Sequence, residues 1–528
     1  MPEYVAPGVS VEEINRGPQP IEGVSTTTAG FIGETERGST TPTLVTSWRD
    51  YERRFGDYID RQTAQPHLFL PYAARGFFDN GGQRLFVARV VGPDAVSATA
   101  DLGNCTVQAI GPGDWGNNVL MAVTAASASR PGTPTAERFR ILIAYYREGI
   151  DPATFVDPTD PQQLGNPQRA EPTVFEDYDN LSAVATDANF VTAAVNAKSY
   201  LLRVASCTGR PNDVAFPDAS LHGGVSDPAT LAEYLDANTT DPGQRRGLAG
   251  LMTIREISLL AAPDEVVVPG LRDKVIEACD RSKDRFAIVS ADLNVGDIAN
   301  LHPPRDTAFA AFYFPWVRAS APHTDTGHRL ISSTGHISGI YARVDVERGV
   351  HKAPANEVVR GIVTNDLSPD ERPLEFPVGK REQDLLNPRG VNVIRDFRAE
   401  GRGVRVFGAR TMSSDATWKY VNVRRLFIFI EQSIDRGTQW AAFEPNDEST
   451  WSAIRTSIAN FLRTVWRNGA LMGTTQDEAF FIKCDRTTMT QDDIDKGRLI
   501  CLIGAAPVKP AEFVIFRISQ QTLAAAQT

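Results

Sequence analysis

Few residues of this chain stand in a pattern that could carry out chemistry. The nearest approach to a phosphate-binding loop is Gly401–Gly408, but its glycine spacing matches neither the dinucleotide pattern nor the P-loop pattern. Because Val404 and Val406 alternate with Arg405, the segment is better interpreted as a strand that begins at the glycines. Ser338 lies in G-H-I-S-G, which is not the G-x-S-x-G elbow of hydrolases. The sequence therefore predicts no catalytic residue and no cofactor.

Histidine and cysteine could also bind metals. His323, Asp325, His328 and His336 lie close together in the sequence, but without the helical pairing of H-E-x-x-H, so chance clustering is the preferred interpretation. The five cysteines are odd in number, scattered and without a C-x-x-C pair, which predicts buried free thiols instead of a disulfide framework or a zinc site. They are Cys105, Cys207, Cys279, Cys484 and Cys501.

Length and charge limit the function classes. A chain of 528 residues with 42% hydrophobic and 23% charged residues can bury several cores, and its length predicts three or four domains. The net charge of -11 argues against direct nucleic-acid binding, which needs a basic face. Residues 391–470 are an exception, because they hold 12 Lys and Arg against 8 Asp and Glu, and this asymmetry can direct partner choice.

The sequence contains no pattern for export or membrane insertion. Residues 1–8 hold neither a basic nor an apolar segment of the kind that signal peptides have. The longest apolar run, Ala308–Val317, is about half of what a spanning helix needs and contains Pro315. We therefore expect synthesis in the cytoplasm without membrane insertion.

Hydrophobic patterns predict a multidomain protein of α/β and α+β class. Prolines and alternating valines make residues 1–22 an extended arm. Strands at Ala29–Gly33 and Arg84–Val91 enclose a helix through Tyr51 to Phe55 that Ser47 can cap and a helix within Leu68–Phe78. A second α/β unit spans residues 211–359 and contains a buried strand at Phe286–Ser290. Between them, the acidic and proline-rich stretch Glu148–Asp187 reads as a solvated outer loop.

The clearest helix is predicted at Asp447–Asn468, with Asn446 as its cap and Gly469 as its left-handed stop. At about 100° per residue, one apolar stripe forms, and a cationic face lies on the other side. The stripe contains Trp451, Ile454, Ile458, Leu462 and Val465, with Phe461 at its edge; the cationic face contains Arg455, Arg463 and Arg467.

Several short blocks lie in a fixed order along the chain. In the last third these are Gly349–Asn356, Phe407–Thr411, Val423–Leu426 and Ala505–Phe513; further blocks are Pro7–Glu13, Gly113–Asn117, Phe312–Trp316, Leu386–Asn387 and Val391–Arg395. Together the blocks resemble the sheath proteins of contractile phage tails and contractile injection particles. One departure lies at Ser332–Gly335, where many sheaths carry prolines before the glycine, and it affects only the geometry expected of that turn.

The resemblance implies a tail-sheath fold, in which both ends of the chain build an inner domain and the middle forms inserted outer domains. It places a linking arm at residues 1–22 and an inner domain at 23–95 plus 360–509. An outer β-rich domain at 96–210 and a middle α/β domain at 211–359 are inserted into it, and 510–528 form a linking strand and tail.

The resemblance also implies a function, partners and assembly in the bacterial cytoplasm, with release by lysis if the particle works outside a cell. Family sheaths stack as hexameric rings in a six-start helix around an inner tube protein, bounded by baseplate and terminator or cap proteins, and their terminal arms add strands to neighbouring subunits. The arm positions here are Val5, Val9, Val11, Ile14, Phe513, Val514, Ile515, Phe516 and Ile518. Sequence leaves open that both arms pair within their own subunit.

Contraction needs stored energy, which the resemblance places in a metastable extended lattice. We hypothesise that Arg455, Arg463 and Arg467 face the tube in that state, although arginines in the last helical turns also complement the helix dipole. Two other functions stay open: a cytoplasmic α/β enzyme with an unrecognised site, and a polymer-forming protein that does not contract.

Overall fold

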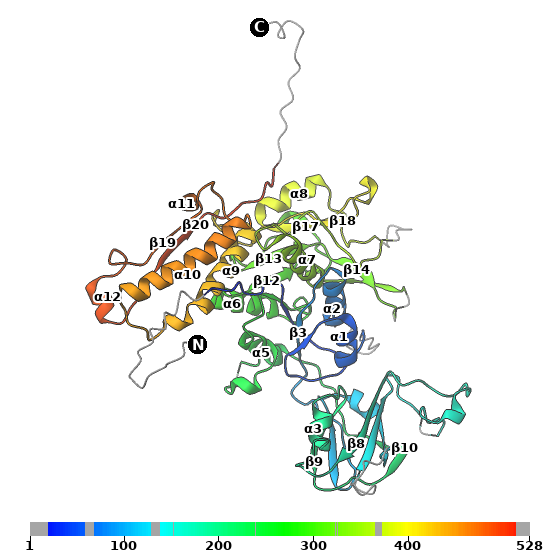
Figure 1. Ribbon diagram of the computed structural model, residues 1–528. Coiled ribbons are helices and arrows are strands. Elements are labelled where there is room, and N and C mark those ends of the chain that lie inside the picture. Colours follow the sequence, from blue (N-terminus) through cyan, green and yellow to red (C-terminus); the bar gives the residue numbers. More distant parts are fainter. Residues whose placement is uncertain are drawn as a thin grey trace, which may run out of the picture. The chain divides into compact units, whose positions relative to one another are not determined.

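The computed structural model (Figure 1) describes residues 20–58, 68–127, 138–151, 153–237, 239–322, 324, 326–364 and 372–513. The chain divides into two compact units. The larger unit contains Ser25–Glu347 and Pro354–Lys419, and the smaller unit is described over residues 20–24, Arg348–Ala353 and 420–513. Each unit has a core of its own.

A nine-stranded sheet forms the centre of the larger unit. In spatial order its strands are β16 (Glu357–Val358), β18 (Val404–Val406), β17 (Val391–Asp396), β13 (Ala310–Phe314), β12 (Phe286–Ser290), β11 (Leu259–Ala261), β1 (Ala29–Gly33), β3 (Leu85–Arg89) and β2 (Thr43–Val45). The six strands from β17 to β3 in this order run parallel. Every residue of β1, β11, β12 and β13 is buried, because parallel sheets are covered on both faces.

Helices cover this sheet, and their starts follow from the sequence. Ser47 caps α1 (Trp48–Phe55) by accepting the Asp50 N–H, as predicted. The predicted helix within Leu68–Phe78 is α2 (Leu70–Asp79). Helix α7 (Thr334–Arg348) is buried along Thr334–Val344, as expected for an internal helix. The other helices of the unit are α3 (Val191–Asn196), α4 (Leu231–Leu235), α5 (Gly247–Thr253), α6 (Leu271–Ser282) and α8 (Lys380–Leu386).

The sheet differs from the division of domains expected from the sequence. Residues 23–95 and 211–359, which were expected in separate domains, contribute strands to one hydrogen-bonded ladder, where Ala29 is the neighbour of both Leu259 and Leu85. The reason is that β1 and β11 are short and fully buried, so each needs a partner on both edges. Residues 354–419 add β17 and β18 to the same sheet.

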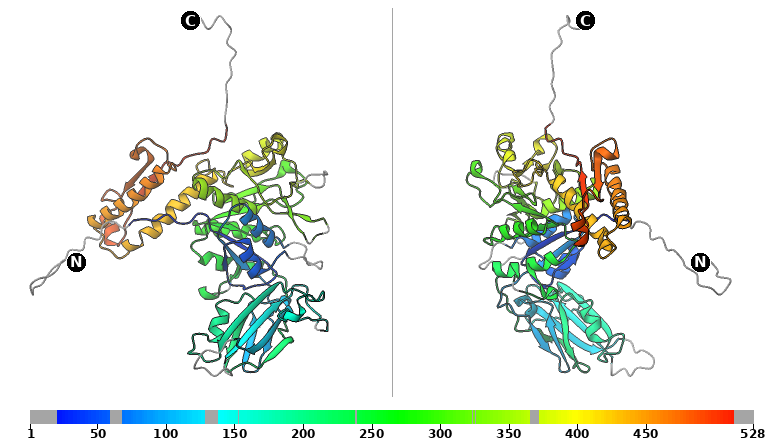
Figure 2. Two further views of the ribbon diagram at one scale, coloured as in Figure 1. Left: turned by 45° about the vertical axis from the view of Figure 1, so that its right-hand side comes forward. Right: turned by 90° about the vertical axis from the view of Figure 1, so that its left-hand side faces the viewer.

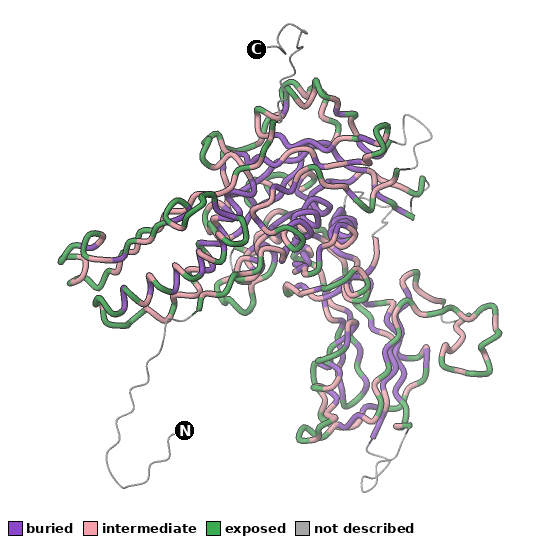
Figure 3. The backbone as a smooth tube through the Cα atoms, turned by 45° about the horizontal axis from the view of Figure 1, so that its top comes forward, coloured by how far each residue is buried: buried purple, intermediate pink, exposed green. Residues whose placement is uncertain are grey.

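A β domain is inserted between β3 and β11 (Figures 1 and 2). Its two sheets enclose one apolar core that includes Trp115, Met121 and Ile143, and Figure 3 draws the domain as buried stretches that alternate with intermediate and exposed ones. The first sheet contains β10 (Val214–Ser220), β6 (Val119–Ala125), β7 (Arg138–Tyr145) and β8 (Val174–Ser182); the second contains β4 (Thr99–Asp101), β5 (Cys105–Ala109) and β9 (Leu202–Cys207). A hairpin of the larger unit outside these sheets contains β14 (Val317–Ser320) and β15 (His328–Ile331).

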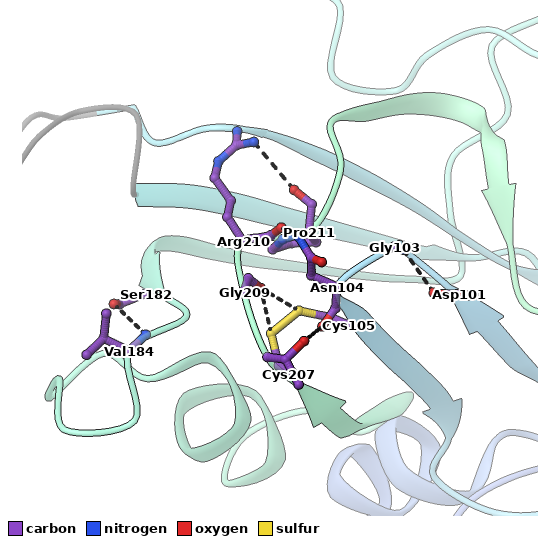
Figure 4. Close-up of a disulfide and its surroundings, with 11 residues drawn as sticks. Asp101, Gly103, Asn104, Cys105, Ser182, Val184, Cys207, Gly209, Arg210 and Pro211 are labelled. Carbon is purple, nitrogen blue, oxygen red and sulfur yellow. Dashed lines mark hydrogen bonds between the residues drawn. A yellow bond between two sulfur atoms is a disulfide. The ribbon is translucent and has the colours of Figure 1, made fainter.

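The prediction that all five cysteines are free thiols was wrong for one pair. Cys105 and Cys207 are opposite each other on β5 and β9 and form a disulfide (Figure 4), with both sulfur atoms 3.2 Å from the carbonyl oxygen of Gly209. The two cysteines are 102 residues apart in the sequence, so only the pairing of these strands brings them together. Cys279, Cys484 and Cys501 are free.

The acidic stretch Glu148–Asp187 is not a loop throughout, because Val174–Ser182 forms strand β8. The alternation of apolar and polar residues that would predict strand β8 is interrupted by the buried carboxylate of Glu176. Glu176 is buried and accepts hydrogen bonds from the Ser199 hydroxyl at 2.7 Å and the Tyr200 N–H at 2.8 Å. A partnered carboxylate can therefore take a core-facing position that the sequence pattern assigns to an apolar residue.

The smaller unit is a helical layer against a hairpin. It contains α9 (Val421–Gly437), α10 (Glu448–Arg467), α11 (Gln476–Ala479), β19 (Phe480–Lys483), α12 (Gln491–Asp495) and β20 (Leu502–Ala505). Figure 2 shows α10 lying along the two strands. Leu426 of α9, Leu462 of α10 and Phe480 of β19 share one core cluster, so the unit is held together by apolar contacts between segments that follow one another in the chain.

Asp264 is a fully buried carboxyl near the carboxyl end of β11. It accepts a hydrogen bond from the Phe69 N–H at 2.7 Å and another from the Tyr234 hydroxyl at 3.0 Å. Burial disfavours the carboxylate and raises the pKa of Asp264 to about 7. Because the folded state holds this proton up to a higher pH than the unfolded chain, Asp264 lowers stability as pH rises from about 4 to about 7.

Asp264→Asn should remove this pH dependence. The introduced amide reproduces the shape of the protonated acid, so the variant should match the wild type near pH 4 and become more stable by roughly 2–4 kcal/mol near pH 8. Urea unfolding at several pH values measures the difference. The control Asp384→Asn removes the same charge from an exposed side chain and should run parallel to the wild type. A constant offset of Asp264→Asn at all pH values would contradict the prediction.

Candidate functional site

Helix α10 separates a core face from a polar face. All of Trp451, Ile454, Ile458, Leu462 and Val465 are buried, as is Phe461, which confirms the predicted stripe. The cap differs from the prediction: Asp447 accepts the Thr450 N–H, whereas Asn446 accepts the Trp451 indole N–H at 2.8 Å. The helix ends at Arg467, and Gly469 follows with a φ of 80°. The polar face of α10 is therefore fixed by the packing of the opposite face.

The three arginines of α10 have different environments. Arg455 donates hydrogen bonds to the Cys484 carbonyl oxygen and, at 3.0 Å, to Glu448. Arg463 donates to the side-chain oxygens of Gln476 at 3.1 Å and Asn460 at 2.9 Å. Arg467 is exposed. Two of the three predicted contact residues thus also hold their own subunit together, and Arg467 offers the most accessible charge.

The hairpin β19–β20 has a buried face and an exposed face. The register pairs Phe480 with Ala505 and Ile482 with Ile503, and these residues pack on the core that contains α10. On the other face, Phe481 is 48% exposed and Leu502 is 52% exposed. Large apolar side chains that remain exposed on a regular surface indicate an interaction site.

Some backbone N–H groups of β20 point away from β19. The Ala506 N–H donates to the Ala479 carbonyl, so alternation of the ladder turns the N–H groups of Ala505 and Ile503 away from β19. Within the described residues, β19 and β20 form a two-stranded sheet. An open edge of this kind is a template for strand addition.

The predicted arm residues are mostly outside the described residues. Val5, Val9, Val11, Ile14, Val514, Ile515, Phe516 and Ile518 all fall there. Phe513 is described and 70% exposed, and the preceding Glu512 accepts a hydrogen bond from the Tyr420 hydroxyl at 3.2 Å. The chain therefore leaves the smaller unit next to the start of α9.

Comparison with protein families gives matches over the second half of the chain. The phage tail sheath protein central domain matches residues 251–412, and the phage tail sheath C-terminal domain matches residues 413–521, about half of the chain together. The chain belongs to the contractile tail sheath family. The matched region contains β12, β13, α7 and the whole of α9, α10 and the β19–β20 hairpin.

Curated relatives of this sheath protein include bacterial and phage proteins. A prophage major tail sheath protein of Pseudomonas aeruginosa is 24% identical over 300 residues, which cover 55% of this chain and 73% of the relative. The tail sheath protein of Enterobacteria phage T4 is 26% identical over 188 residues. That alignment covers 35% of this chain and only 26% of the T4 protein, so this chain spans about a quarter of that relative.

Solved structures share the fold over nearly the whole length of the sheath protein. The helical sheath of the anti-feeding prophage in its contracted state superposes with a TM-score of 0.57 at 23% identity, covering 98% of this chain and all of that one. The sheath complex of the extracellular contractile injection system PVC, also contracted, gives a TM-score of 0.56 at 22% identity and covers 99% of both chains. These likenesses establish the mixed α/β sheath fold.

Side chains occupy the crevice of the central sheet in which an enzyme of this topology would bind a ligand. Doubly wound sheets bind ligands beyond the carboxyl ends of the strands, where the strand order reverses. That point lies between β1 and β11, and a Cβ built on Gly33 would be 2.5 Å from Asp264 Oδ2 and 2.9 Å from Leu70. The side chains of the sheath protein therefore fill this crevice.

Metal and membrane sites were also considered. Within the described residues, no group of three or more His, Cys, Asp and Glu side chains is placed to hold a metal ion, and no helix is long and apolar enough to cross a bilayer. Of the residues that lie close together in the sequence around His328, His323 and Asp325 lie outside the described residues. His328 lies on β15 and His336 is buried on α7, where burial lowers its pKa to about 4.

A charged cluster joins the inserted β domain to α1 and the β1 end of the sheet. Tyr145 donates a hydrogen bond to Glu36, and Arg147 lies 3.5 Å from Glu36 and 3.4 Å from Asp57. Arg37 lies over the Tyr145 ring and donates to the carbonyl oxygens of Glu52 and Arg53. A cleft of about 550 Å³ lies beside these residues. The cluster fixes the inserted domain by several directional contacts.

Arg455→Ala should loosen the hairpin. The change removes the charged donor of the Cys484 carbonyl, and we expect the local stability of β19–β20 to fall by about 1 kcal/mol, since the arginine is partly exposed. Hydrogen–deuterium exchange of peptides from residues 480–505 should become roughly fivefold faster. Arg467→Ala is the matched control and should leave exchange within error. Equal exchange in both variants would contradict a structural role for Arg455.

Proposed function

We propose that this chain is the structural sheath subunit of a contractile, phage-tail-like injection machine. The observation that carries the proposal is the family match in the second half of the chain together with superposition of nearly the whole chain on contracted sheath structures. In this function the subunit polymerises around an inner tube, and contraction of the polymer drives the tube into a target.

The proposed polymer is a stack of hexameric rings wound as a six-start helix. Supporting this symmetry, one solved neighbour is a chain of the six-fold symmetrised baseplate of the anti-feeding prophage, at a TM-score of 0.54. We further propose that the smaller unit lies next to the tube, that the inserted β domain faces outward, and that the ends of the polymer bind baseplate and terminator or cap proteins. Direct nucleic-acid binding is not part of the proposal.

The β19–β20 hairpin is the proposed acceptor of strands from neighbouring subunits. The outward N–H groups of Ile503 and Ala505 lie on a regular strand, and residues 1–22 and 510–528 are the donors that the family resemblance implies. Each added hydrogen bond contributes about 0.5–1.5 kcal/mol net, before the entropy of ordering the arm is subtracted. Many such pairings keep a lattice connected while its rigid units rotate.

Ala505→Pro should block strand addition while leaving the subunit folded. Proline removes one outward N–H, and the ladder bonds to β19 are made by the adjacent residues. Negative-stain microscopy of protein expressed with the tube protein of the same particle should show ribbed cylinders for the wild type and none for the variant.

Circular dichroism of the Ala505→Pro subunit provides the folding control, and Ala505→Ser, which keeps the backbone donor at the same position, should still form cylinders. Deletion of residues 1–19 removes a donor instead of an acceptor and should give the same loss. Cylinders from both the proline and the deletion variants would rule out strand exchange through this edge. Discrete soluble oligomers from the wild type would instead favour an enzyme.

The proposed energy source is metastability of the extended lattice. A change of state can be driven only by a difference in interaction free energy between two states. We propose that a baseplate signal releases subunits from an extended lattice into a shorter and wider one with more subunit contact. The proposed movement is one of rigid parts, since the inserted β domain and the smaller unit each have an apolar core.

The proposed tube contact is the polar face of α10. Arg467 is its most exposed arginine, and Arg463 and Arg455 lie one and three turns earlier with partners in their own subunit. Exposed ion pairs are weak and screened by salt, typically below about 1 kcal/mol each. A contact of this kind can hold an extended sheath on a tube and still be broken during contraction.

Arg467→Glu should reduce assembly on tubes, because it reverses the exposed charge of this face. We expect fewer extended sheaths per tube, with a larger defect at low salt than at high salt. Electron microscopy with counted particles provides the measurement. Lys380→Glu, an equal charge change at a side chain that is 83% exposed in the larger unit, is the matched control. Normal assembly of Arg467→Glu at low salt would exclude the tube contact.

A further inference from the structure

Two free cysteines face each other at the end of the β19–β20 hairpin. The ladder pairs Phe480 with Ala505 and Lys483 with Leu502, and the same register places Cys484 opposite Cys501. Both side chains belong to one apolar cluster, so the two thiols lie on the same face of the hairpin. Seventeen positions separate them in the sequence, so the pairing depends entirely on the hairpin.

The backbone at this position suits a disulfide. The Ala506 N–H bonds to the Ala479 carbonyl, and counting along the ladder makes Cys484 and Cys501 a non-hydrogen-bonded pair. Such pairs have Cα atoms about 4.5 Å apart, which lies within the range of about 4.4–6.8 Å found in disulfides.

The existing disulfide occupies the same kind of position. The Thr208 N–H bonds to the Asn104 carbonyl, which makes the adjacent Cys105 and Cys207 a non-hydrogen-bonded pair as well. The two cysteine pairs of the chain therefore share one backbone arrangement.

The surroundings hold the two sulfur atoms in place. Cys484 is buried with Trp451 and Met489, and the partly buried Cys501 packs against the same cluster. Arg455 of α10 donates to the Cys484 carbonyl, which ties this end of β19 to the helix. Cys279 is different, because it is buried in α6 of the larger unit.

We propose that Cys484 and Cys501 form a reversible disulfide that staples the β19–β20 hairpin. With a small-molecule disulfide such as oxidised glutathione, the thiolate of the more accessible Cys501 attacks one glutathione sulfur and releases one glutathione thiolate. The Cys484 thiolate then attacks the Cys501 sulfur and releases the second. Two protein thiols are oxidised to one disulfide, two glutathione molecules are produced, and the two thiol protons pass to the released thiolates.

The staple would close the segment of residues 485–500, which carries α12 and its capping box, at the tip of the hairpin. It would be open in a reducing cytoplasm and closed in an oxidising surrounding. Burial and the neighbouring Cys484 raise the pKa of the Cys501 thiol to about 12, so the bond should form slowly at neutral pH and faster in alkali. The inference concerns the subunit alone and stands independently of the proposed function.

Alkylation and peptide mapping test the staple. The native full-length protein is incubated with either dithiothreitol or oxidised glutathione, then denatured, alkylated and digested with trypsin. After oxidation, the peptide Cys484–Arg486 should be found linked to the peptide that begins at Leu499. The dithiothreitol-treated sample that serves as reference retains only the Cys105–Cys207 disulfide, and the oxidised protein should have two alkylation sites fewer than this reference. The melting temperature should rise by a few degrees.

Two internal controls belong to the chain. Cys279 should be alkylated under both conditions, and Cys105–Cys207 should be recovered as a disulfide after oxidation. Cys501→Ser should abolish both the linked peptide and the rise in melting temperature, whereas Cys279→Ser should change neither. Full alkylation of Cys484 and Cys501 in oxidised protein in which Cys105–Cys207 is bonded would overturn the proposal.

Discussion

The parallel ladder through β1 is the constraint on which the larger unit depends. β1 is buried over its whole length and bonds to β3 on one side and β11 on the other, although about 170 residues separate these two neighbours along the chain. A buried strand cannot leave its backbone groups unpaired, so the chain must return to this edge after any excursion. The inserted β domain is such an excursion, which is why it begins and ends at adjacent points, with the Gly92 N–H donating to the Asp227 carbonyl at 2.8 Å.

The same constraint explains the charged residues around the excursion. Two backbone connections alone would leave the inserted domain free to rotate about them. Directional contacts prevent this rotation. Arg147 pairs with Glu36, the Tyr145 hydroxyl donates a hydrogen bond to the same carboxylate, and the buried Arg37 lies over the Tyr145 ring. The partners described for these polar side chains lie within the chain, so the cluster serves to hold the inserted domain.

The smaller unit is stabilised in a different way. Its hairpin is too small to be stable alone, and the apolar stripe of α10 provides the surface on which one face of the hairpin is buried. Within the described residues, Phe481 and Leu502 on the opposite face stay about half exposed and β20 pairs with β19 alone, which suits the strand addition proposed for this edge. In the proposed function, the acceptor edge and the cationic face of α10 belong to one small unit, so a single movement would change both contacts.

The sequence determined by itself the family, the strands Ala29–Gly33 and Phe286–Ser290, the α1 cap at Ser47 and the core stripe of α10, because each depends on local order or on periodicity along one segment. The tertiary structure decided that residues 23–95 and 211–359 share a sheet, that Cys105 bonds to Cys207, that Glu176 lies in a strand, and that Arg455 contacts its own hairpin. These features arise from contacts between segments far apart in the chain or across a turn. The spacing of residues in one sequence does not show which strands will be neighbours, because strand pairing depends on which faces of the strands become buried together.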